Sequence, residues 1–340
     1  MKENDFPRYL TRFLSLYLPG QKNVSSHTIA AYRDTFKLFL TYCEALRRLP
    51  PERLTMAQLT KELVLGFLDW LETDRHCSIS TRNHRLAVIH SFVKFVHKEF
   101  PENLYETQKI LAIPNKKSQK PMVSYLTGEE MRIILSQPDS HTKDGFRDLV
   151  LLSVLYDTAA RVDELINSKV KHVRLMNPAV ITLHGKGNKV RQVPLMNNTK
   201  SLLAAYMDRR KISSGMADLE NFLFVNQKRQ KLSRWGISYI INKYVDQAKK
   251  NLAFTIHFPV TPHIFRHSKA MHLLQSGVNL IYIRDFLGHS DCSTTEIYAR
   301  ADSEMKRKAI ENAYPDLVPE GLPKWEEDGD LMRWLSSLCE

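Results

Sequence analysis

Residues 114–121, with the sequence Pro-Asn-Lys-Lys-Ser-Gln-Lys-Pro, constrain the fold of this chain more than any other segment. Prolines at both ends and polar residues between them can neither continue a helix nor fill a core, which predicts a linker. The 340 residues are enough for about two domains with a core each. We therefore expect a first domain over residues 1–115, a linker over 116–121, a second domain over 122–315 and a tail over 316–340.

The charge of the chain is distributed unevenly along it. The net charge is +12, with +7 over residues 1–120, +10 over 121–315 and −5 over the last 25 residues. Two basic blocks indicate a polyanionic partner, most simply nucleic acid, and a basic protein without such a partner is the alternative. Extended, residues 114–121 span roughly 25 Å, comparable to the width of a DNA duplex. Lys116, Lys117 and Lys120 could therefore cross a double helix held between two domains.

The sequence carries no sign of export, of a membrane span or of a metal site. The N-terminus lacks an apolar signal core, and no apolar run approaches about 18 residues. The four cysteines are scattered and form no Cys-x-x-Cys pair, which favours reduced thiols over disulfides or zinc. We expect a cytoplasmic protein without metal, cofactor or membrane partner.

Hydrophobic periodicity predicts that the first domain is helical. One helix is expected after the cap Ser25, with its apolar face between Ile29 and Cys43, another near residues 64–70, and a third from about Ser78 onward. Outside the apolar stripes, the first and third helices carry hydroxyl and basic side chains that suit DNA phosphates: Thr28, Arg33, Lys37, Thr81, Arg82 and Arg85. Solvated faces without a ligand are the alternative.

The second domain is predicted to be α+β, mainly helical with a small β-sheet. Thr127 and Glu130 have the spacing of a capping box at the start of its first helix. Residues 180–183 and 190–195 flank a Gly-Lys-Gly-Asn turn, which predicts a β-hairpin, and residues 222–225 could form a further strand. Residues 149–156 are expected in a buried helix, and Ser233 before another helix, where Arg234 is a further candidate for DNA contact.

Three separated segments of the second domain carry the residues that matter for chemistry. The first holds Arg161 and Glu164, and the second holds Lys186 in the hairpin turn, followed by Arg-Gln-Val-Pro at 191–194. The third contains His-Ile-Phe-Arg-His at 263–267, Leu-Gly-His at 287–289, and Tyr298 nine residues after that last histidine. Each piece alone is a weak signal. Their order resembles that of the tyrosine recombinase (phage integrase) family, almost end to end in the second domain and more weakly in the first.

The resemblance implies a helical core-binding domain and a catalytic domain that hold duplex DNA as a C-shaped clamp. Tyr298 would attack the scissile phosphate, giving a 3′-phosphotyrosine and a free 5′-hydroxyl. Arg161 and Arg266 would bind the non-bridging oxygens, for which planar guanidinium groups suit better than lysines. The other implied roles are those of His263 as general base, His289 as hydrogen-bond donor to the phosphate, Lys186 as general acid and Glu164 as the residue that holds Arg161 or His263.

Each of these residues also has an ordinary structural interpretation. Arg161 and Glu164 could be a helical i,i+3 ion pair, and Lys186 could be a solvated turn residue. The two histidines at 263 and 267 could bind zinc, although the arginine between them and the lack of a zinc-protease glutamate disfavour this. Tyr298 could be a core tyrosine, as we expect Tyr282 to be. Their joint occurrence in order is what favours catalysis.

Two departures from the family pattern bear on the subfamily. Ala159 stands where a glycine is usual, and Lys269 stands where an aromatic residue is common; the second is more typical of transposon integrases than of Xer-type resolvases. The resemblance then implies integration or excision of a mobile element in a bacterial cytoplasm, with the protein at the nucleoid when bound to DNA. A tetramer on two specific sites would act without ATP or metal, alone or with related recombinases. The alternatives are a Xer-like resolvase, a type IB topoisomerase-like enzyme and a non-catalytic DNA-binding accessory protein.

The acidic tail is predicted to end in a short amphipathic helix. Asp330 precedes Leu331, Trp334, Leu335 and Leu338, which have the i, i+3, i+4, i+7 spacing of one apolar face. A helix this short must bury that face to be stable. We expect it to dock on a neighbouring protomer, with docking on its own domain as the alternative.

Overall fold

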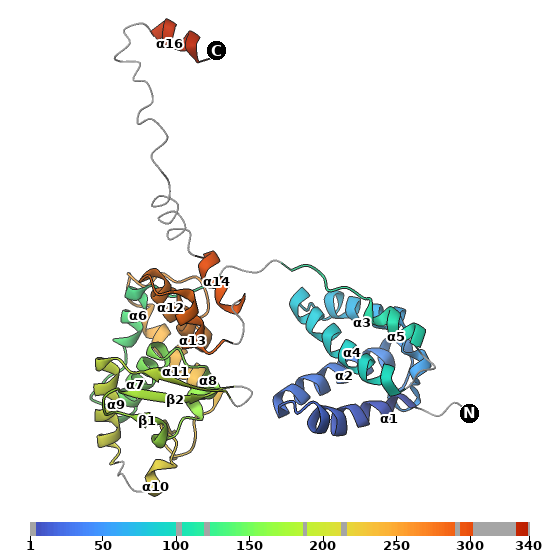
Figure 1. Ribbon diagram of the computed structural model, residues 1–340, viewed down its shortest axis with the longest axis horizontal. Coiled ribbons are helices and arrows are strands. Elements are labelled where there is room, and N and C mark those ends of the chain that lie inside the picture. The colour runs from blue at the N-terminus through green and yellow to red at the C-terminus, as the bar shows by residue number, and fades with distance from the viewer. Residues whose placement is uncertain are drawn as a thin grey trace. The chain divides into compact units, whose positions relative to one another are not determined.

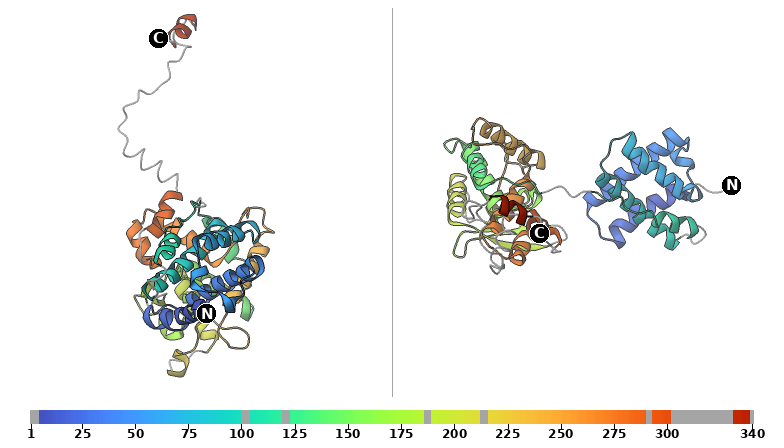
Figure 2. Two further views of the ribbon diagram at one scale, coloured as in Figure 1. Left: turned by 90° about the vertical axis from the view of Figure 1, so that its right-hand side faces the viewer. Right: turned by 90° about the horizontal axis from the view of Figure 1, so that it is seen from above.

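The computed structural model describes residues 5–99, 104–118, 123–185, 189–211, 216–289, 293–301 and 331–338. Contacts within the chain divide it into two compact units, Met1–Pro121 and Met122–Glu340. The first unit consists of helices, and the second surrounds a small sheet with helices (Figures 1 and 2). No described helix is long and apolar enough to cross a membrane.

The helices of the first unit follow the predicted periodicity. They are α1 (Asp5–Arg12), the π-helical η1 (Phe13–Gln21), α2 (Ser26–Arg47), the short 3-10 turns Pro51–Arg53 and Met56–Gln58, α3 (Lys61–Thr73), α4 (Ile79–Glu99) and α5 (Leu104–Leu111). The side chain of Ser25 accepts a hydrogen bond from the Thr28 backbone N–H, as expected of a cap. Thr60 caps α3 in the same way through the Leu63 N–H.

An aromatic core holds the first unit together. The Phe92 ring of α4 lies 5.3 Å from Phe13 and 5.1 Å from Phe36, both edge-on, and Phe39 of α2 meets Phe67 of α3 at 5.3 Å. Such pairs contribute roughly 0.5–1.5 kcal/mol each beyond the burial of their area. The core therefore fixes α2, α3 and α4 relative to one another and leaves their polar faces at the surface of the unit.

The second unit is built from helices packed around one antiparallel sheet. Its helices are α6 (Gly128–Leu135), α7 (Lys143–Asp157), α8 (Val162–Ile166), α9 (Asn197–Arg209), α10 (Met216–Leu219), α11 (Arg234–Ala248), α12 (Pro262–Gln275), α13 (Leu280–Leu287) and α14 (Ser293–Ala301), with α16 (Leu331–Ser337) near the C-terminus. The 3-10 turn Val170–His172 leads into the sheet. The capping box of Thr127 with Glu130 and the cap Ser233 before α11 are confirmed.

The sheet has three strands in the order β1 (Val173–Arg174), β2 (Val180–His184) and β3 (Val190–Pro194). The predicted hairpin is confirmed, with Leu183 opposite Arg191 and His184 opposite Val190. β1 was not predicted, because two residues carry no periodicity. Residues 222–225 form only isolated bridges, from Phe222 to Lys169 and from Val225 to Lys231, so the further strand is not formed.

Two apolar clusters lie inside the second unit. The larger one includes Leu151 of α7, Ile181 of β2, Ile241 of α11 and Phe265 of α12. The smaller one lies where α12, α13 and α14 meet at one end of the unit (Figure 1) and contains Ala159, Ala270, Met271, Leu274, Ile283, Leu287 and Tyr298. One face of α12 therefore packs in the same cluster as Ala159 and Tyr298.

The structure also bears on the predicted burial of Tyr282 and on the predicted C-terminal helix. Tyr282 is not a core tyrosine, since it is 71% exposed on α13, where the helix buries Ile283 and Leu287 instead. The predicted C-terminal helix is present as α16, with Leu335 and Leu338 exposed. Residues 302–330 and the side chain of Trp334 lie outside the described residues.

Candidate active site

Two arginines from different segments converge at the end of the second unit. Arg266 of α12 is buried and donates hydrogen bonds to the carbonyls of Ala159 at 2.7 Å and Leu287 at 2.6 Å. Arg161 precedes α8 and is about one-third exposed; its Nη1 lies 2.8 Å from Glu164 Oε1, and its Nη2 lies 3.3 Å from the Gly288 carbonyl. Arg266 is thus fixed by main chain, while Arg161 still faces solvent.

The backbone at Ala159 has an unusual conformation that serves these contacts. Ala159 is buried with φ of +46°, in the left-handed region that costs an L-residue roughly 1–2 kcal/mol. A glycine would adopt this conformation freely, which explains why glycine is usual at this position. The turn directs the Ala159 carbonyl toward the guanidinium of Arg266, so a strained residue helps to fix the arginine.

A third arginine, which the sequence did not single out, belongs to the same cluster. Arg191 of β3 lies with Nη2 2.9 Å from Glu164 Oε2, and its Nη1 donates to the Leu287 carbonyl at 3.1 Å. Glu164 is buried and is therefore shared between Arg161 and Arg191. The Glu164 pairing with Arg161 was predicted. Arg191 meets Glu164 from 27 residues away and Leu287 from 96 residues away, separations that leave no local pattern.

The electrostatics of this cluster favour an anionic ligand. Three guanidinium groups surround a single carboxylate, and burial together with Arg161 and Arg191 lowers the pKa of Arg266 to about 9. Burial also lowers the pKa of Arg191, against the opposing effect of Glu164. Even with this shift, Arg266 stays charged at neutral pH. Like charges held this close destabilise the free protein, and an anion such as a phosphate would relieve their repulsion.

The histidines of the site differ in exposure and in partners. His263, on the first turn of α12, keeps an exposed edge, and the partial burial of its ring, followed by the charges of Arg266 and Arg161, lowers its pKa. His289, just after α13, pairs through Nδ1 with the Thr295 hydroxyl at 2.9 Å. Burial and then the charges of Arg266, Arg161 and Arg191 lower the pKa of His289 to about 4. At neutral pH these imidazoles are uncharged, so each can donate through one nitrogen and accept through the other.

Tyr298 of α14 lies in the smaller apolar cluster with 1% of its surface exposed. Its hydroxyl is 2.9 Å from Nδ1 of His267, one turn after His263 on α12. Burial raises the pKa of Tyr298, while Arg266 and Arg161 act to lower it. The partner of the hydroxyl is thus His267, a residue whose contact with Tyr298 the sequence did not predict, rather than the predicted base His263.

The hairpin turn that contains Lys186 is described only at its base. Lys186 itself lies outside the described residues. The Gly185 N–H donates to the Lys189 carbonyl at 2.7 Å, and a Cβ at Gly185 would lie 3.0 Å from Glu164 Oε1. The base of the turn therefore packs directly against the carboxylate that holds Arg161.

The lysine that departs from the family pattern has a partner in this chain. Lys269 Nζ lies 3.1 Å from Asp157 Oδ1 and 4.9 Å from the centre of the Tyr156 ring. Asp157 is buried, and its other oxygen accepts a hydrogen bond from the Met196 N–H at 3.2 Å. Lys269 thus contributes to the packing of α12 against α7.

The candidate DNA-contacting residues of the first unit divide into exposed and buried ones. Arg82 is buried, with Nε 3.2 Å from Glu72 Oε1, so its predicted place on the exposed face of α4 is wrong. Arg85 is half-buried and joins α4 to α2 through the Thr35 hydroxyl at 2.8 Å. Helical periodicity explains both, since they share the face of α4 that packs on α2 and α3.

The other candidates lie at or near the surface. Arg33 pairs with its neighbour Asp34, Lys116 with Glu72 at 2.7 Å, and the exposed Arg234 with Asp163. The hydroxyls of Thr28 and Thr81 lie within hydrogen-bonding distance of Ser25 and Ser78. Lys37 and Lys117 are exposed, and Lys120 lies outside the described residues.

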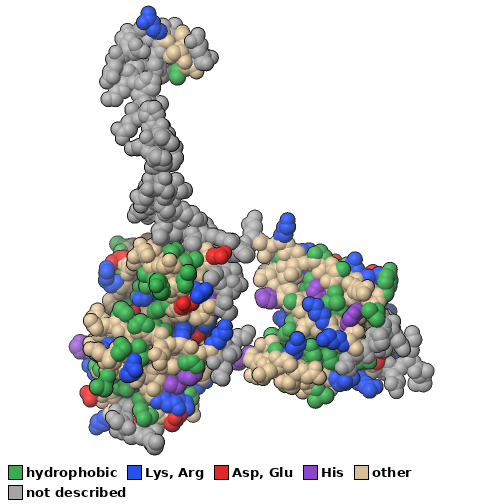
Figure 3. Space-filling model, viewed as in Figure 1, with side chains coloured by type: hydrophobic (Ala, Val, Ile, Leu, Met, Phe, Trp, Pro, Cys, Tyr) green, Lys and Arg blue, Asp and Glu red, His purple; other side chains and the backbone are tan. Residues whose placement is uncertain are grey.

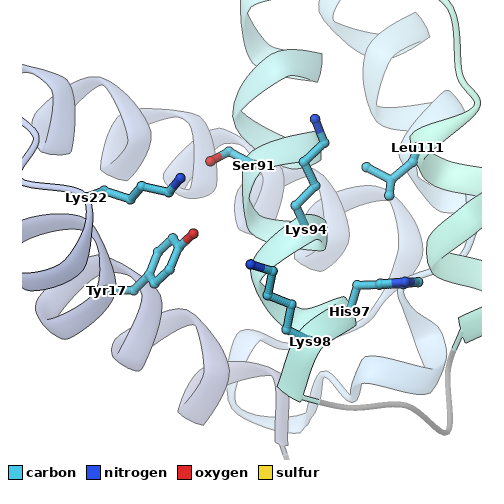
Figure 4. Close-up of a pocket in the computed structure, with 7 residues that line it drawn as sticks. All are labelled: Tyr17, Lys22, Ser91, Lys94, His97, Lys98 and Leu111. Carbon is cyan, nitrogen blue, oxygen red and sulfur yellow. The ribbon is translucent and has the colours of Figure 1, made fainter.

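The exposed face of α4 borders a basic hollow with a volume of about 290 Å³. We call it the lysine hollow; its walls are Tyr17, Lys22, Ser91, Lys94, His97, Lys98 and Leu111 (Figure 4). Lys22 and Lys98 extend toward one another from opposite walls (Figure 4). The structure gives the three lysines no carboxylate partner among the described residues. Figure 3 shows further lysine and arginine side chains on this unit. The sequence did not predict this hollow, because the wall with Lys22 comes from a distant segment.

Two family models match the chain. The phage integrase family matches residues 124–305, and the phage integrase N-terminal SAM-like domain matches residues 10–99. The chain is 33% identical over 329 residues to the integrase/recombinase y4rC of Sinorhizobium fredii, covering 97% of each chain. It is 30% identical over 299 residues to the tyrosine recombinase XerD of Staphylococcus epidermidis, covering 88% of this chain and 96% of the other.

Solved structures share the fold. The XerH site-specific recombinase bound to a palindromic difH substrate matches with a TM-score of 0.67 and 22% identity, over 85% of this chain and 80% of the other. The Tn1549 transposon integrase in complex with transposon right-end DNA matches with a TM-score of 0.68 and 15% identity, over 88% of this chain and 98% of the other.

Proposed function

This chain belongs to the phage integrase family and is a tyrosine recombinase, and we propose that Tyr298 is the nucleophile with which it cuts and rejoins DNA strands. The observation that carries the assignment is the tyrosine hydroxyl, held by an imidazole 2.9 Å away and within the field of two guanidinium groups. A phenol ionises near pH 10 and is a poor nucleophile when neutral, so positive charge and a proton acceptor are what it needs.

The proposed cleavage step is a phosphoryl transfer from a sugar oxygen to the tyrosine. The oxygen of Tyr298 bonds to phosphorus while the bond to the 5′ oxygen breaks. The tyrosine proton passes to a histidine, and Lys186 gives a proton to the leaving 5′ oxygen, leaving a 3′-phosphotyrosine and a 5′-hydroxyl. A 5′-hydroxyl of another strand reverses the step. The phosphotyrosine link keeps the energy of the broken bond, so resealing requires no nucleotide hydrolysis.

The proposed base is His263, and His267 holds the tyrosine before the reaction. Tyr298 is 1% exposed in the present conformation, so a phosphate cannot reach its hydroxyl until α14 shifts. His263 is exposed on the same face of α12 as Arg266 and is available to the tyrosine once it has moved. Arg161 then binds one non-bridging oxygen with its exposed guanidinium edge, and Arg266 and His289 contact the phosphate beside it.

The proposed role of the first unit is to bind DNA and not to take part in the chemical step. Its lysine hollow offers three ammonium groups that have no carboxylate partner in the part of the chain that the structure describes, which suits a DNA phosphate. The exposed Arg33 and Lys37 of α2 are proposed as further phosphate contacts, while the buried Arg82 pairs with Glu72 and so joins α4 to α3.

A nicked suicide substrate tests the nucleophile. Cleavage beside the nick releases a short fragment, which leaves the covalent protein–DNA adduct trapped. We expect wild type to form a protease-sensitive adduct and Tyr298→Phe to form none while binding the same DNA. Tyr282→Phe, at an exposed tyrosine of the same unit, is the matched control and should react normally. Adduct formation by the Tyr298→Phe protein would refute the assignment.

The biological reaction proposed is integration or excision of a mobile element by a tetramer on two sites. A second candidate, favoured by the 30% identity to a XerD protein, is a Xer-type reaction that needs a partner recombinase. An assay with the purified chain and two copies of the junction sequence from its host element distinguishes these two candidates. Recombination by this chain alone supports the first candidate, dependence on a second recombinase supports the other, and relaxation of supercoils without exchange would indicate a topoisomerase.

The proposed role of the C-terminal helix is to join protomers. Leu335 of α16 and Leu338 directly after it are exposed, and a helix of seven residues requires a partner surface to be stable. Removing residues 316–340 should leave binding to a single site intact and weaken pairing of two sites. A truncated protein that pairs sites and recombines like wild type would exclude this role.

A further inference from the structure

Arg191 contacts three segments at once from a single strand. Its guanidinium pairs with Glu164, donates to the Leu287 carbonyl at 3.1 Å, and lies 3.4 Å from the Ala159 carbonyl. Its side chain is only 12% exposed, although it lies beside the turn of the hairpin, directly opposite Leu183. The strand that follows the Lys186 turn is thereby tied to α8, to the end of α13 and to the turn before Arg161.

Every acceptor that Arg191 uses is shared with one of the two arginines proposed to bind phosphate. The carbonyls of Ala159 and Leu287 also accept from Arg266, and Glu164 Oε1 also accepts from Arg161 at 2.8 Å. A shift of Arg191 would therefore move or release the acceptors that orient both of the others. The coupling is through direct hydrogen bonds and crosses no intermediate residue.

The packing around Arg191 leaves little freedom for it to move. A Cβ at Gly288 would lie 3.0 Å from Arg191 Cδ, so the absence of a side chain at Gly288 is what admits the arginine. Gly288 has φ of +65°, ends α13 and precedes His289. Its carbonyl also accepts from Arg161 at 3.3 Å. The hairpin, the end of α13 and Arg161 thus meet at one tightly packed point.

The remaining hydrogen-bonding capacity of Arg191 does not suit direct contact with substrate. Both of its terminal nitrogens are directed at protein acceptors, and its Nε is buried without a partner in the described structure. Among the described residues, each terminal nitrogen of Arg191 has two protein acceptors, which uses both of its hydrogens. Each terminal nitrogen of Arg266 has one acceptor and so keeps a hydrogen for a phosphate, and Arg161 keeps donors at the surface. Arg191 is therefore a positioning residue and not a catalytic one.

We propose that Arg191 fixes the hairpin that carries Lys186 against the phosphate-binding arginines, so that the proton donor and the phosphate are held in register. The inference rests on the proposed function, in which Lys186 protonates the leaving oxygen. Loss of Arg191 would release the hairpin and Glu164 together. The step most affected would be protonation of the leaving group, and binding of DNA least.

The test compares Arg191→Gln with wild type on two substrates, the ordinary suicide DNA and the same DNA with a 5′-bridging phosphorothiolate. A sulfur leaving group departs without a proton. We expect Arg191→Gln to cleave ordinary DNA roughly 10²-fold more slowly, the size of loss expected when a reacting group is displaced by about 1 Å. The phosphorothiolate should recover at least about tenfold of that loss, which is part of the roughly 10²–10⁴-fold that general acid catalysis contributes.

Controls separate positioning from folding and from charge. Arg174→Gln removes the same charge from an exposed arginine of the same sheet and should cleave both substrates like wild type. If Arg191→Gln unfolds at the assay temperature, Arg191→Lys keeps the charge without the forked geometry and should show the same recovery on the sulfur substrate. Wild-type rates for both Arg191 variants, or an equal loss on both substrates, would overturn the inference. A wild type that forms no adduct on either substrate would instead overturn the proposed function, and this inference with it.

Discussion

The two basic regions of the chain hold positive charge in opposite ways. In the second unit, Arg161, Arg191 and Arg266 share acceptors, and Arg266 is buried with both terminal nitrogens on main-chain carbonyls. In the lysine hollow, Lys22 and Lys98 approach one another on flexible stems without a carboxylate among the described residues. One region has charge that is fixed in direction, and the other has charge that is free to adjust.

This difference indicates what each region can contribute. Fixed guanidinium groups in a partly dry site are aimed before the substrate arrives, which is the condition for stabilising a transition state. Exposed ammonium groups are screened by salt and bind any phosphate placed within reach. Changes in the arginine cluster should therefore alter the rate of cleavage, and changes in the lysine hollow should alter affinity and its dependence on salt.

The largest effect is expected from Arg266→Lys. A lysine keeps the charge but cannot donate to the carbonyls of Ala159 and Leu287 and contact a phosphate as well. Cleavage under saturating DNA should fall roughly 10²–10³-fold, as when one fixed donor is removed from a transition state. Arg132→Lys, at an exposed arginine of α6, is the control for the same exchange. Near-normal cleavage by Arg266→Lys would show that the fixed orientation of the Arg266 guanidinium group is unimportant for the rate of cleavage.

A smaller effect is expected from Lys98→Gln in the lysine hollow. Removing one phosphate contact should make the slope of log affinity against log salt less steep by about 0.9. Cleavage of saturating DNA should stay unchanged. Lys109→Gln is the matched control, because Lys109 already pairs with Glu106 at 2.8 Å. Equal slopes for wild type and Lys98→Gln between about 50 and 200 mM salt would remove the lysine hollow from the DNA-binding surface.

Acid sensitivity should be set by the imidazoles beside the arginine cluster. Burial, then His263 and Arg266, lowers the pKa of His267 from 6.5 to about 4. Between pH 6.5 and about 4, His267 binds a proton in the unfolded chain but not in the folded one. The stability that neutral His267 contributes is therefore complete above about pH 6.5 and is lost as the pH falls toward 4. His267→Gln should flatten the fall in melting temperature over that range, whereas His257→Gln, at an exposed histidine, should not. A wild-type melting temperature that is constant between these pH values would contradict the prediction.

The smallest effect concerns the backbone that holds the fixed cluster. Ala159→Gly and Ala160→Gly each remove a buried methyl group, but only Ala159 has a positive φ. Relief of left-handed strain should make Ala159→Gly more stable than Ala160→Gly by about 1 kcal/mol. Chemical denaturation of both variants measures the difference. Equal stability would show that Ala159 stores no strain.

Features that depend on residues close together in the chain could be predicted from the sequence. The helices follow from apolar spacing, the caps at Ser25, Thr127 and Ser233 from residue type, and the β2–β3 hairpin from alternation around glycines. The ordered motif from Arg161 to Tyr298 was enough to assign the family. The helices, caps and hairpin could be predicted because each depends on the local sequence. The family could be predicted because its motif residues occur in a characteristic order along the chain.

Features created by distant contacts could not be predicted in this way. Arg191 meets Leu287, 96 residues later, and nothing in its own strand marks it as buried. Arg82 looked like a surface residue because its charge suggested exposure, yet Glu72 from another helix pairs with it inside. Tyr282 was the opposite case, an aromatic residue placed outward by its position on α13. Residue type alone therefore misjudged the burial of side chains whose surroundings are decided by how the helices pack.

The start of the interdomain segment is attached to the first unit, and this shortens the tether between the units. Asn83 of α4 exchanges two hydrogen bonds with the Lys116 backbone, at 2.8 and 3.1 Å, and Lys116 also pairs with Glu72. Counted along the sequence, residues 117–122 connect Lys116 to the second unit, and six residues reach at most roughly 20 Å. Once one unit is on DNA, so short a tether presents the other at an effective concentration in the millimolar range. The second unit can therefore occupy its own stretch of DNA even where its affinity for DNA on its own is weak.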